Sequence, residues 1–208
     1  MAHLVLIRHG RSEYNVKGLW TGWHDPELTR DGREEVKKAA QTIADIPLSL
    51  GFSSPQIRHQ DTLAIVKRAL QIEDLPIIID DALKERNYGD YTGKNKWEVK
   101  KILGEEEFFK LRRGWDYPVP NGESLKQVYD RVVRYYTSNI FPNLLQQKNV
   151  IISSSGNALR SLVKFLENIT EEDIVKLEIA PGEVYVYTLD ERGNITHKEI
   201  RNAGPNTV

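Results

Sequence analysis

The chain has 208 residues, with 29 Lys and Arg against 30 Asp and Glu, and it contains no cysteine. At roughly 150 residues per domain, this length predicts a single domain over residues 1–208. The lack of cysteine excludes disulfides and thiolate chemistry, and the formal net charge of −1 argues against a globally basic protein that binds nucleic acid.

Short apolar runs along the chain predict buried strands. The first run, Leu4–Ile7, is too short for a secretory signal, and charge follows it at once. No window reaches 18 apolar residues, so we expect no transmembrane helix, no membrane partner and a cytoplasmic location. The later strands are expected at Leu48–Phe52, Pro76–Ile79, Val150–Ile152 and Val184–Leu189, the last followed by a turn at Asp190–Asn194.

Amphipathic patterns between these runs predict helices. Thr29 is the expected N-cap of a helix over Arg30–Ile46, whose apolar positions keep a 3.6-residue period. Further helices are expected over Thr62–Leu70, after Gly122-Glu123-Ser124, over Ala158–Leu166 and, as a short one, after Thr170.

Alternating strands and helices predict a three-layer α/β fold, with a mostly parallel sheet flanked by helices. Ligands of such sheets bind in the loops at the carboxyl ends of the strands. Two such loops stand out, Arg8-His9-Gly10 and Ser154-Ser155-Gly156-Asn157. The second leads into a helix, whose free N–H groups favour an anion.

Short motifs continue in a fixed order through the chain. They are Arg8-His9-Gly10, Thr21-Gly22-Trp23, Ser54-x-x-x-Arg58, Glu85-Arg86-x-Tyr88-Gly89, Asn95-Lys96, Arg112-Arg113, Gly122-Glu123-Ser124 and Gly156-Asn157-Ala158-Leu159-Arg160. Together they resemble the histidine phosphatase superfamily and, within it, the 2,3-bisphosphoglycerate-dependent phosphoglycerate mutases. The resemblance runs from Leu4 to about Leu189 and implies the fold of that family.

The chemistry of these residues agrees with the resemblance. Phosphoryl transfer to histidine needs a neutral imidazole and fixed positive charge around the phosphoryl oxygens. We expect His9 as the nucleophile, Arg8 and Arg58 as that charge, and Glu85 as the general acid and base. A second cationic group would hold the distal anion of the substrate: Lys96, Arg112 and Arg113. The five histidines include no pair at a metal-ligand spacing, so we expect no metal.

The resemblance further implies interconversion of 3-phosphoglycerate and 2-phosphoglycerate through a phosphohistidine at His9, as a step of glycolysis and gluconeogenesis. It implies 2,3-bisphosphoglycerate as primer, phosphoglycerates as the small-molecule partners, and a monomer or homodimer. It also adds substrate contacts at Asn15, Thr21, Gly22, Tyr88, Gly156 and Asn157.

One departure from the family concerns catalysis directly. Ser155 stands where the family has a second histidine just before Gly-Asn, and no histidine follows it until His197. We therefore expect no replacement for this imidazole and assign no role to His24 or His59. Ser155 remains a candidate catalytic residue, and Ser155→His is expected to raise kcat.

Three functions stay open at this point. The first is the mutase, which the second cationic group favours. The second is a broad phosphomonoesterase of the same superfamily, in which water takes the phosphoryl group. The third is a catalytically weakened protein that binds phosphate metabolites, which Ser155 suggests.

Overall fold

A six-stranded sheet forms the centre of the protein, in a computed structural model that describes residues 1–202. The strand order is β3-β2-β4-β1-β5-β6. The strands are β1 (Ala2–Arg8), β2 (Leu50–Ser53), β3 (Ile77–Ile79), β4 (Val150–Ser154), β5 (Val184–Leu189) and β6 (Ile195–Arg201). Neighbouring pairs among β1, β4, β2 and β3 are parallel, and β5 is antiparallel to both β1 and β6. The mostly parallel α/β sheet expected from the sequence is confirmed.

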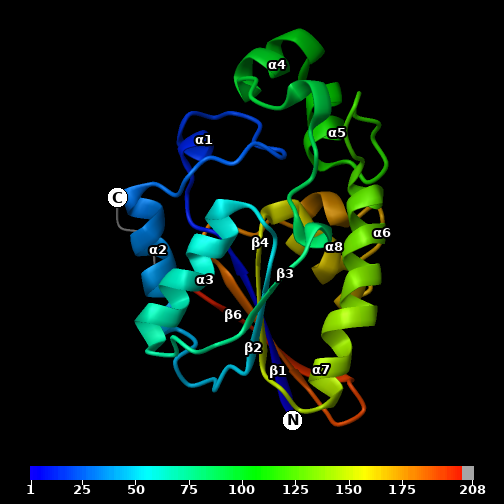
Figure 1. The fold of residues 1–208 in the computed structure, drawn as a ribbon. Helices are drawn as coiled ribbons and strands as arrows, with labels where there is room; N and C mark the ends of the chain where they lie inside the picture. Colours follow the sequence, from blue (N-terminus) through cyan, green and yellow to red (C-terminus); the bar gives the residue numbers. More distant parts are fainter. Residues whose placement is uncertain (203–208) are drawn as a thin grey trace.

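Helices cover both faces of this sheet and give the three layers (Figure 1). On one face, α2 (Arg30–Gln41) and α3 (Ile57–Leu70) pack on Val5, Ile7 and Ile151. The other face carries α6 (Leu125–Tyr135), a π-helical turn (Tyr136–Ile140), α7 (Phe141–Leu145) and α8 (Gly156–Leu166). Both apolar layers are fully buried at the centre of the sheet, so β1 and β4 form a rigid base for the loops that follow them.

Three further helices lie beyond the carboxyl ends of the parallel strands, at the top of Figure 1. They are α1 (Glu13–Val16), α4 (Lys96–Leu103) and α5 (Glu105–Arg113). Helices α4 and α5 pack on a small apolar cluster that is separate from the two layers on the sheet and contains Trp20, Tyr88 and Phe108. These helices therefore cover the edge of the sheet where the candidate site residues lie.

Several expectations from the sequence need correction. Pro76–Ile79 was expected as a buried strand, but β3 is an edge strand on which Ile78 and Ile79 are exposed. The helix after Thr29 ends at Gln41, because Thr42 caps it. The helix expected from Thr62 begins at Ile57, and β6 was not expected at all. Helices α1, α4, α5 and α7 were not predicted either. The other strands and α-helices lie close to their predicted ranges, and the helix after Thr170 is a short 3-10 helix (Ile174–Lys176).

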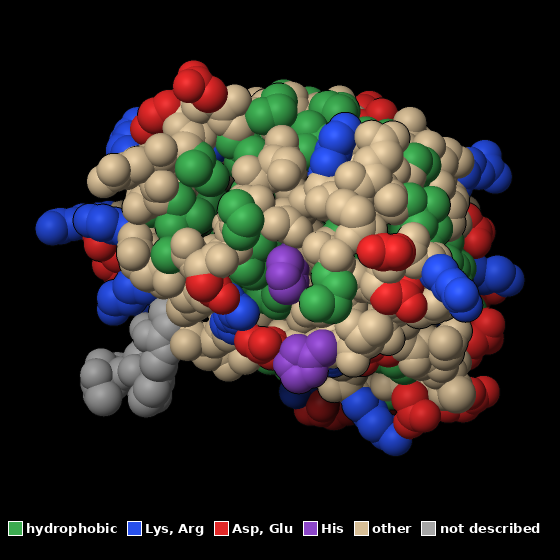
Figure 2. Space-filling view, turned by 90° about the horizontal axis from the view of Figure 1, so that it is seen from below, with side chains coloured by type: hydrophobic (Ala, Val, Ile, Leu, Met, Phe, Trp, Pro, Cys, Tyr) green, Lys and Arg blue, Asp and Glu red, His purple; other side chains and the backbone are tan. Residues whose placement is uncertain are grey.

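The end of the molecule opposite α4 and α5 carries scattered acidic and basic side chains around apolar ones (Figure 2). No single sign of charge dominates that face. Within residues 1–202, no helix is long and apolar enough to span a bilayer.

Candidate active site

The centre of the site is built at the carboxyl ends of three strands. His9 follows β1, Ser54 follows β2 and Ser155 follows β4. Because β4 lies between β2 and β1, the three loops are neighbours. This is the edge at which open α/β sheets bind their ligands.

His9 is a buried imidazole with one nitrogen already bound. Its Nδ1 lies 2.7 Å from the carbonyl oxygen of Gly10, which can only accept, so Nδ1 carries the proton and Nε2 keeps its lone pair. The backbone at Gly10 packs directly against the backbone at Gly32. A side chain at Gly10 would collide with the carbonyl of Gly32, so only glycine allows the two backbone segments to lie this close. Burial lowers the pKa of His9 well below its usual value, and Arg58 and Arg8 lower it further. His9 is therefore neutral at physiological pH, with Nε2 available as a nucleophile.

The guanidinium groups of Arg8 and Arg58 lie close enough to His9 to lower its pKa. Arg58 is fully buried, and Arg8 is partly buried. Arg58 donates to the carbonyl oxygen of His24 at 3.0 Å, and Arg8 donates to that of Ile179. Within residues 1–202, the Nε atoms of both arginines are buried and lack a hydrogen-bond partner. Burial lowers the pKa of Arg58 to about 10, so it stays charged near neutral pH. Two cations with buried, unused Nε–H groups form an environment suited to an anion.

Ser155 contacts an unexpected residue. It is the N-cap residue of α8, but its hydroxyl makes no capping bond. Instead, Oγ lies 2.6 Å from Nε2 of His59, and Arg58 Nη2 donates to it at 3.4 Å. The His59 ring is fully buried, and its centroid lies 5.3 Å from that of His9.

The expectation that His59 has no place in the site was therefore wrong. It lies in the first turn of α3, directly after Arg58, and this adjacency was the one signal in the sequence. The contact joins residues 96 positions apart, which a single sequence does not reveal.

A pocket lined by Arg8, Glu85, Lys96, Arg112 and Arg113, among others, is called the outer pocket. Glu85 is a nearly buried carboxylate in its wall. Its Oε1 accepts the backbone N–H of Arg86 at 2.6 Å, and its own backbone N–H donates to Gln56 Oε1 at 2.9 Å. Arg86 is in turn held by the carbonyl oxygens of Glu123 and Leu111. The carboxylate is thus fixed at the pocket wall, as a general acid and base requires.

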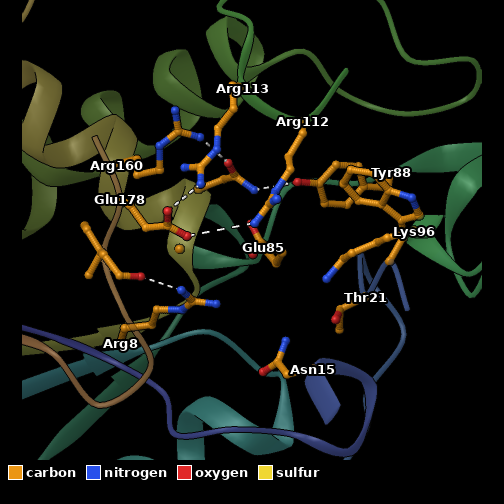
Figure 3. A pocket seen from close by; sticks show the side chains of 14 residues that line it. Arg8, Asn15, Thr21, Glu85, Tyr88, Lys96, Arg112, Arg113, Arg160 and Glu178 are labelled. Carbon is orange, nitrogen blue, oxygen red and sulfur yellow. Dashed lines mark hydrogen bonds and ion pairs between the residues drawn. The ribbon is translucent and has the colours of Figure 1, made fainter. Parts of the chain in front are cut away.

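The outer pocket is cationic (Figure 3). Lys96 begins α4, and Arg112 and Arg113 end α5, so the two helices bring all three predicted cations to one cavity. Burial, together with Arg112 and Arg8, lowers the pKa of Lys96 to about 8. The three groups can hold a carboxylate or a second phosphate.

Glu178 also lies in this pocket, and sequence reasoning missed it. Its carboxylate is 2.6 Å from Arg113 Nη2 and 3.9 Å from Arg112 Nη2. Burial alone would raise the pKa of Glu178, but the hydrogen bond from Arg113 and the charges of Arg113, Arg112 and Arg8 together outweigh burial and lower this pKa. The pocket therefore holds two carboxylates, Glu85 and Glu178, rather than the single one expected.

Most other predicted residues line the same pocket: Arg8, Asn15, Thr21, Tyr88, Gly156 and Asn157. Asn157 donates to the hydroxyl of Tyr88 at 2.9 Å, which fixes both side chains. Gly22 does not line it; its carbonyl oxygen accepts hydrogen bonds from Gln56 and Arg58. His9, Arg58 and Ser155 are also absent from the lining and are buried. In the part of the chain that the structure describes, no three His, Cys, Asp or Glu side chains are placed to hold a metal ion.

Comparisons with known proteins agree on the family of this chain. The family model of the Histidine phosphatase superfamily (branch 1) matches residues 4–200. The 2,3-bisphosphoglycerate-dependent phosphoglycerate mutase of Parvibaculum lavamentivorans is 43% identical over 199 residues, covering 95% of both chains. The enzyme of the same name from Rhizobium meliloti is also 43% identical, covering 95% of this chain and 94% of that one.

Solved structures share the fold. A mycobacterial glucosyl-3-phosphoglycerate phosphatase superposes with a TM-score of 0.79 at 20% identity, covering 97% of each chain. The alpha-ribazole phosphatase of Shigella flexneri gives a TM-score of 0.78 at 23% identity, covering 96% of this chain and 95% of that one.

Proposed function

Since this chain belongs to the histidine phosphatase superfamily, in the family of 2,3-bisphosphoglycerate-dependent phosphoglycerate mutases, we propose that it interconverts 3-phosphoglycerate and 2-phosphoglycerate through a phosphohistidine at His9. One observation carries this proposal. A neutral imidazole with a free Nε2 lies under the influence of two guanidinium groups whose Nε atoms are buried and unpartnered, and one of them, Arg8, also lines a cationic pocket. A substrate with one transferable phosphoryl group and a second anion matches both parts.

Each residue of the inner site has one task in this reaction. His9 Nε2 attacks phosphorus in line with the departing hydroxyl oxygen, and the N–P bond forms as the O–P bond breaks. Arg8 and Arg58 hold the phosphoryl oxygens, together with the free N–H groups at the start of α8. Because these donors are fixed before substrate arrives, they stabilise the transition state without rearranging.

Glu85 moves the proton that balances the transfer. It protonates the hydroxyl oxygen of the substrate as that oxygen leaves phosphorus, and it takes a proton from the accepting hydroxyl in the return step. Lys96, Arg112 and Arg113 hold the carboxylate of the phosphoglycerate and set which hydroxyl faces His9. Asn15, Thr21 and Tyr88 complete the polar wall around the substrate.

The residues present fit 2,3-bisphosphoglycerate as the primer. The unpartnered Nε atoms of Arg8 and Arg58 suit one phosphate, and the cations of the outer pocket suit the second. When bound, this compound supplies the phosphoryl group that loads His9. The cytoplasmic location, the single domain and the monomeric or homodimeric state expected from the sequence remain predictions.

A phosphomonoesterase is the second candidate, and Glu178 is the observation that favours it. Its carboxylate partly neutralises Arg113 and Arg112, which weakens the hold on a second anion. A released product then leaves phosphohistidine open to water, which would take the phosphoryl group as inorganic phosphate.

One assay separates the candidates. Purified protein is given 3-phosphoglycerate with and without 2,3-bisphosphoglycerate, and 2-phosphoglycerate and inorganic phosphate are both measured. The mutase requires 2-phosphoglycerate formation that depends on the primer and is lost in His9→Gln. Release of phosphate alone favours the phosphomonoesterase, and no turnover of either kind contradicts both.

A further inference from the structure

His59 sits in the middle of a buried chain of hydrogen bonds. Its Nδ1 lies 2.6 Å from Ser54 Oγ, and its Nε2 lies 2.6 Å from Ser155 Oγ. All three side chains are fully buried. The chain begins after β2, passes through the first turn of α3 and ends at Ser155, directly after β4. The His59 ring lies 5.3 Å from that of His9, and the backbone N–H of His9 donates to the carbonyl oxygen of Ser154 at 3.2 Å.

Each neutral tautomer of His59 leaves one serine hydroxyl hydrogen of this chain without a partner within residues 1–202. The tautomer that leaves it on Ser155 is the one that serves a ligand, because Ser155 adjoins pocket-lining Gly156 and Ser54 adjoins no residue of the pocket lining. In this tautomer Ser54 Oγ accepts the backbone N–H of Gln56 at 3.1 Å, and its hydroxyl hydrogen is donated to Nδ1 of His59. A neutral imidazole with an unprotonated Nδ1 carries its hydrogen on Nε2, so His59 donates to Ser155.

Ser155 Oγ then receives two hydrogen bonds. His59 Nε2 donates at 2.6 Å and Arg58 Nη2 donates at 3.4 Å, which uses both lone pairs of the hydroxyl oxygen. No acceptor for the Ser155 hydroxyl hydrogen is found among residues 1–202. Ser155 is itself buried, but it directly precedes Gly156, which lines the pocket, so the unpaired hydrogen lies next to the ligand cavity.

Resting on the function proposed above, we propose that His59 is a positioning residue. It holds and polarises Ser155 so that the Ser155 hydroxyl donates to the phosphoryl group transferred at His9. The pair thus supplies, from α3 and the residue between β4 and α8, a donor that the family places on one imidazole at position 155. Donation through a chain of hydrogen bonds strengthens the last one, since each bond polarises the next.

The charge of the pair follows from its surroundings. Burial lowers the pKa of His59 well below its usual value, and Arg58, His9 and Arg8 lower it further. His59 therefore contributes an N–H donor and no positive charge. The charge comes from Arg58, which contacts the same Ser155 oxygen.

A double-mutant cycle tests this assignment. Ser155→Ala is expected to lower kcat by about 10²-fold, the usual effect of losing one transition-state donor, with a smaller change in KM. His59→Leu is expected to lower kcat by about 10-fold or more, because Ser155 loses its fixed orientation. The double variant should be no slower than Ser155→Ala, since His59 acts through Ser155.

Two further variants separate positioning from a structural role. His59→Gln keeps an N–H donor and should recover most of the kcat lost in His59→Leu. Ser161→Ala is the matched control, because Ser161 is a buried serine of α8 whose Oγ has no hydrogen-bond partner within residues 1–202. It should leave kcat unchanged. Thermal unfolding of every variant identifies any loss that comes from misfolding.

The structure also revises the expected gain from Ser155→His. Position 155 is fully buried against the His59 ring, so a second imidazole has no room there. The single variant should lose activity, and the exchange variant His59→Ala/Ser155→His should recover it.

All variants are assayed on 3-phosphoglycerate and on a small phosphomonoester, because the donated hydrogen bond serves the phosphoryl group common to both. A wild type that turns over only the monoester overturns the mutase but still reports on His59. A folded His59→Leu protein with unchanged kcat overturns the inference. So does a double variant whose loss is the product of the two single losses.

Discussion

Glu178 places its carboxylate 2.6 Å from the Arg113 guanidinium, inside the pocket proposed for the second anion of the substrate. The pair joins the end of α5 to the segment that leads into β5. An incoming carboxylate or phosphate must therefore compete with Glu178 for Arg113 and Arg112.

Removing this competitor should tighten substrate binding. The Glu178 side chain is 61% exposed, so the pair contributes at most about 1 kcal/mol. Glu178→Gln is expected to lower KM for 3-phosphoglycerate by about 2- to 5-fold and to leave KM for a small monoester unchanged. Glu172→Gln, an equal charge change at an exposed residue, is the control. Equal shifts in both variants would mean that only net charge matters.

Arg113→Ala tests the division between the two parts of the pocket. Loss of a charge-assisted hydrogen bond costs about 1.5–3 kcal/mol, so KM for 3-phosphoglycerate should rise by about 10-fold or more. A small monoester lacks the second anion, so its KM should change little. The prediction is wrong if both substrates lose affinity equally.

The pH dependence of substrate affinity should report Lys96. Its pKa is lowered to about 8, so its charge is lost as the pH rises through that value. kcat/KM for 3-phosphoglycerate should therefore fall above about pH 8, with the free enzyme's pKa at the inflection. Lys96→Arg, which keeps its charge, should move the fall to higher pH. A profile identical in both proteins would remove Lys96 from the anion site.

Stability should depend on pH through the two buried histidines. Burial holds the pKa values of His9 and His59 well below the 6.5 of an exposed histidine. Below pH 6.5 the unfolded chain binds protons that the folded protein does not, so the free energy of unfolding falls as the pH falls. Each histidine contributes a slope of up to about 1.4 kcal/mol per pH unit.

Denaturant unfolding between about pH 5 and pH 7 measures this slope. His59→Gln should remove the contribution of one histidine from the slope, while Ser161→Ala, which alters a buried side chain without a titratable group, should leave it unchanged. A wild-type slope that His59→Gln does not change would contradict the burial of a neutral His59.

Periodicity predicted the parts of the fold whose apolar residues repeat clearly. Strands β1 and β4 each contain a continuous apolar run, Leu4–Ile7 and Val150–Ile152, and α2 keeps its 3.6-residue period. Strand β6 was missed because most of its residues are polar or charged and it lies at the edge of the sheet. The exposure of β3 was missed for a related reason, since three isoleucines look the same at an edge as in the centre.

The candidate site was predictable where residues cluster along the chain. His9 and Arg8 adjoin each other after β1, and Arg112 and Arg113 are neighbours at the end of α5. The contacts of His59 with Ser155 and of Glu178 with Arg113 depend on pairs far apart in the sequence. Each of the missed side chains is also common as an ordinary structural or surface residue, so its type alone carried no signal.

The position of the phosphoryl group after incubation with 2,3-bisphosphoglycerate tests the central claim most directly. Protein treated with the labelled compound is digested, and the modified residue is mapped by mass spectrometry under conditions that preserve phosphohistidine. The account predicts an acid-labile, base-stable phosphoryl group on His9 that is absent from His9→Gln and still formed in His59→Gln. A phosphoryl group on Ser155 or Ser12, or none on the folded wild-type protein, would contradict it.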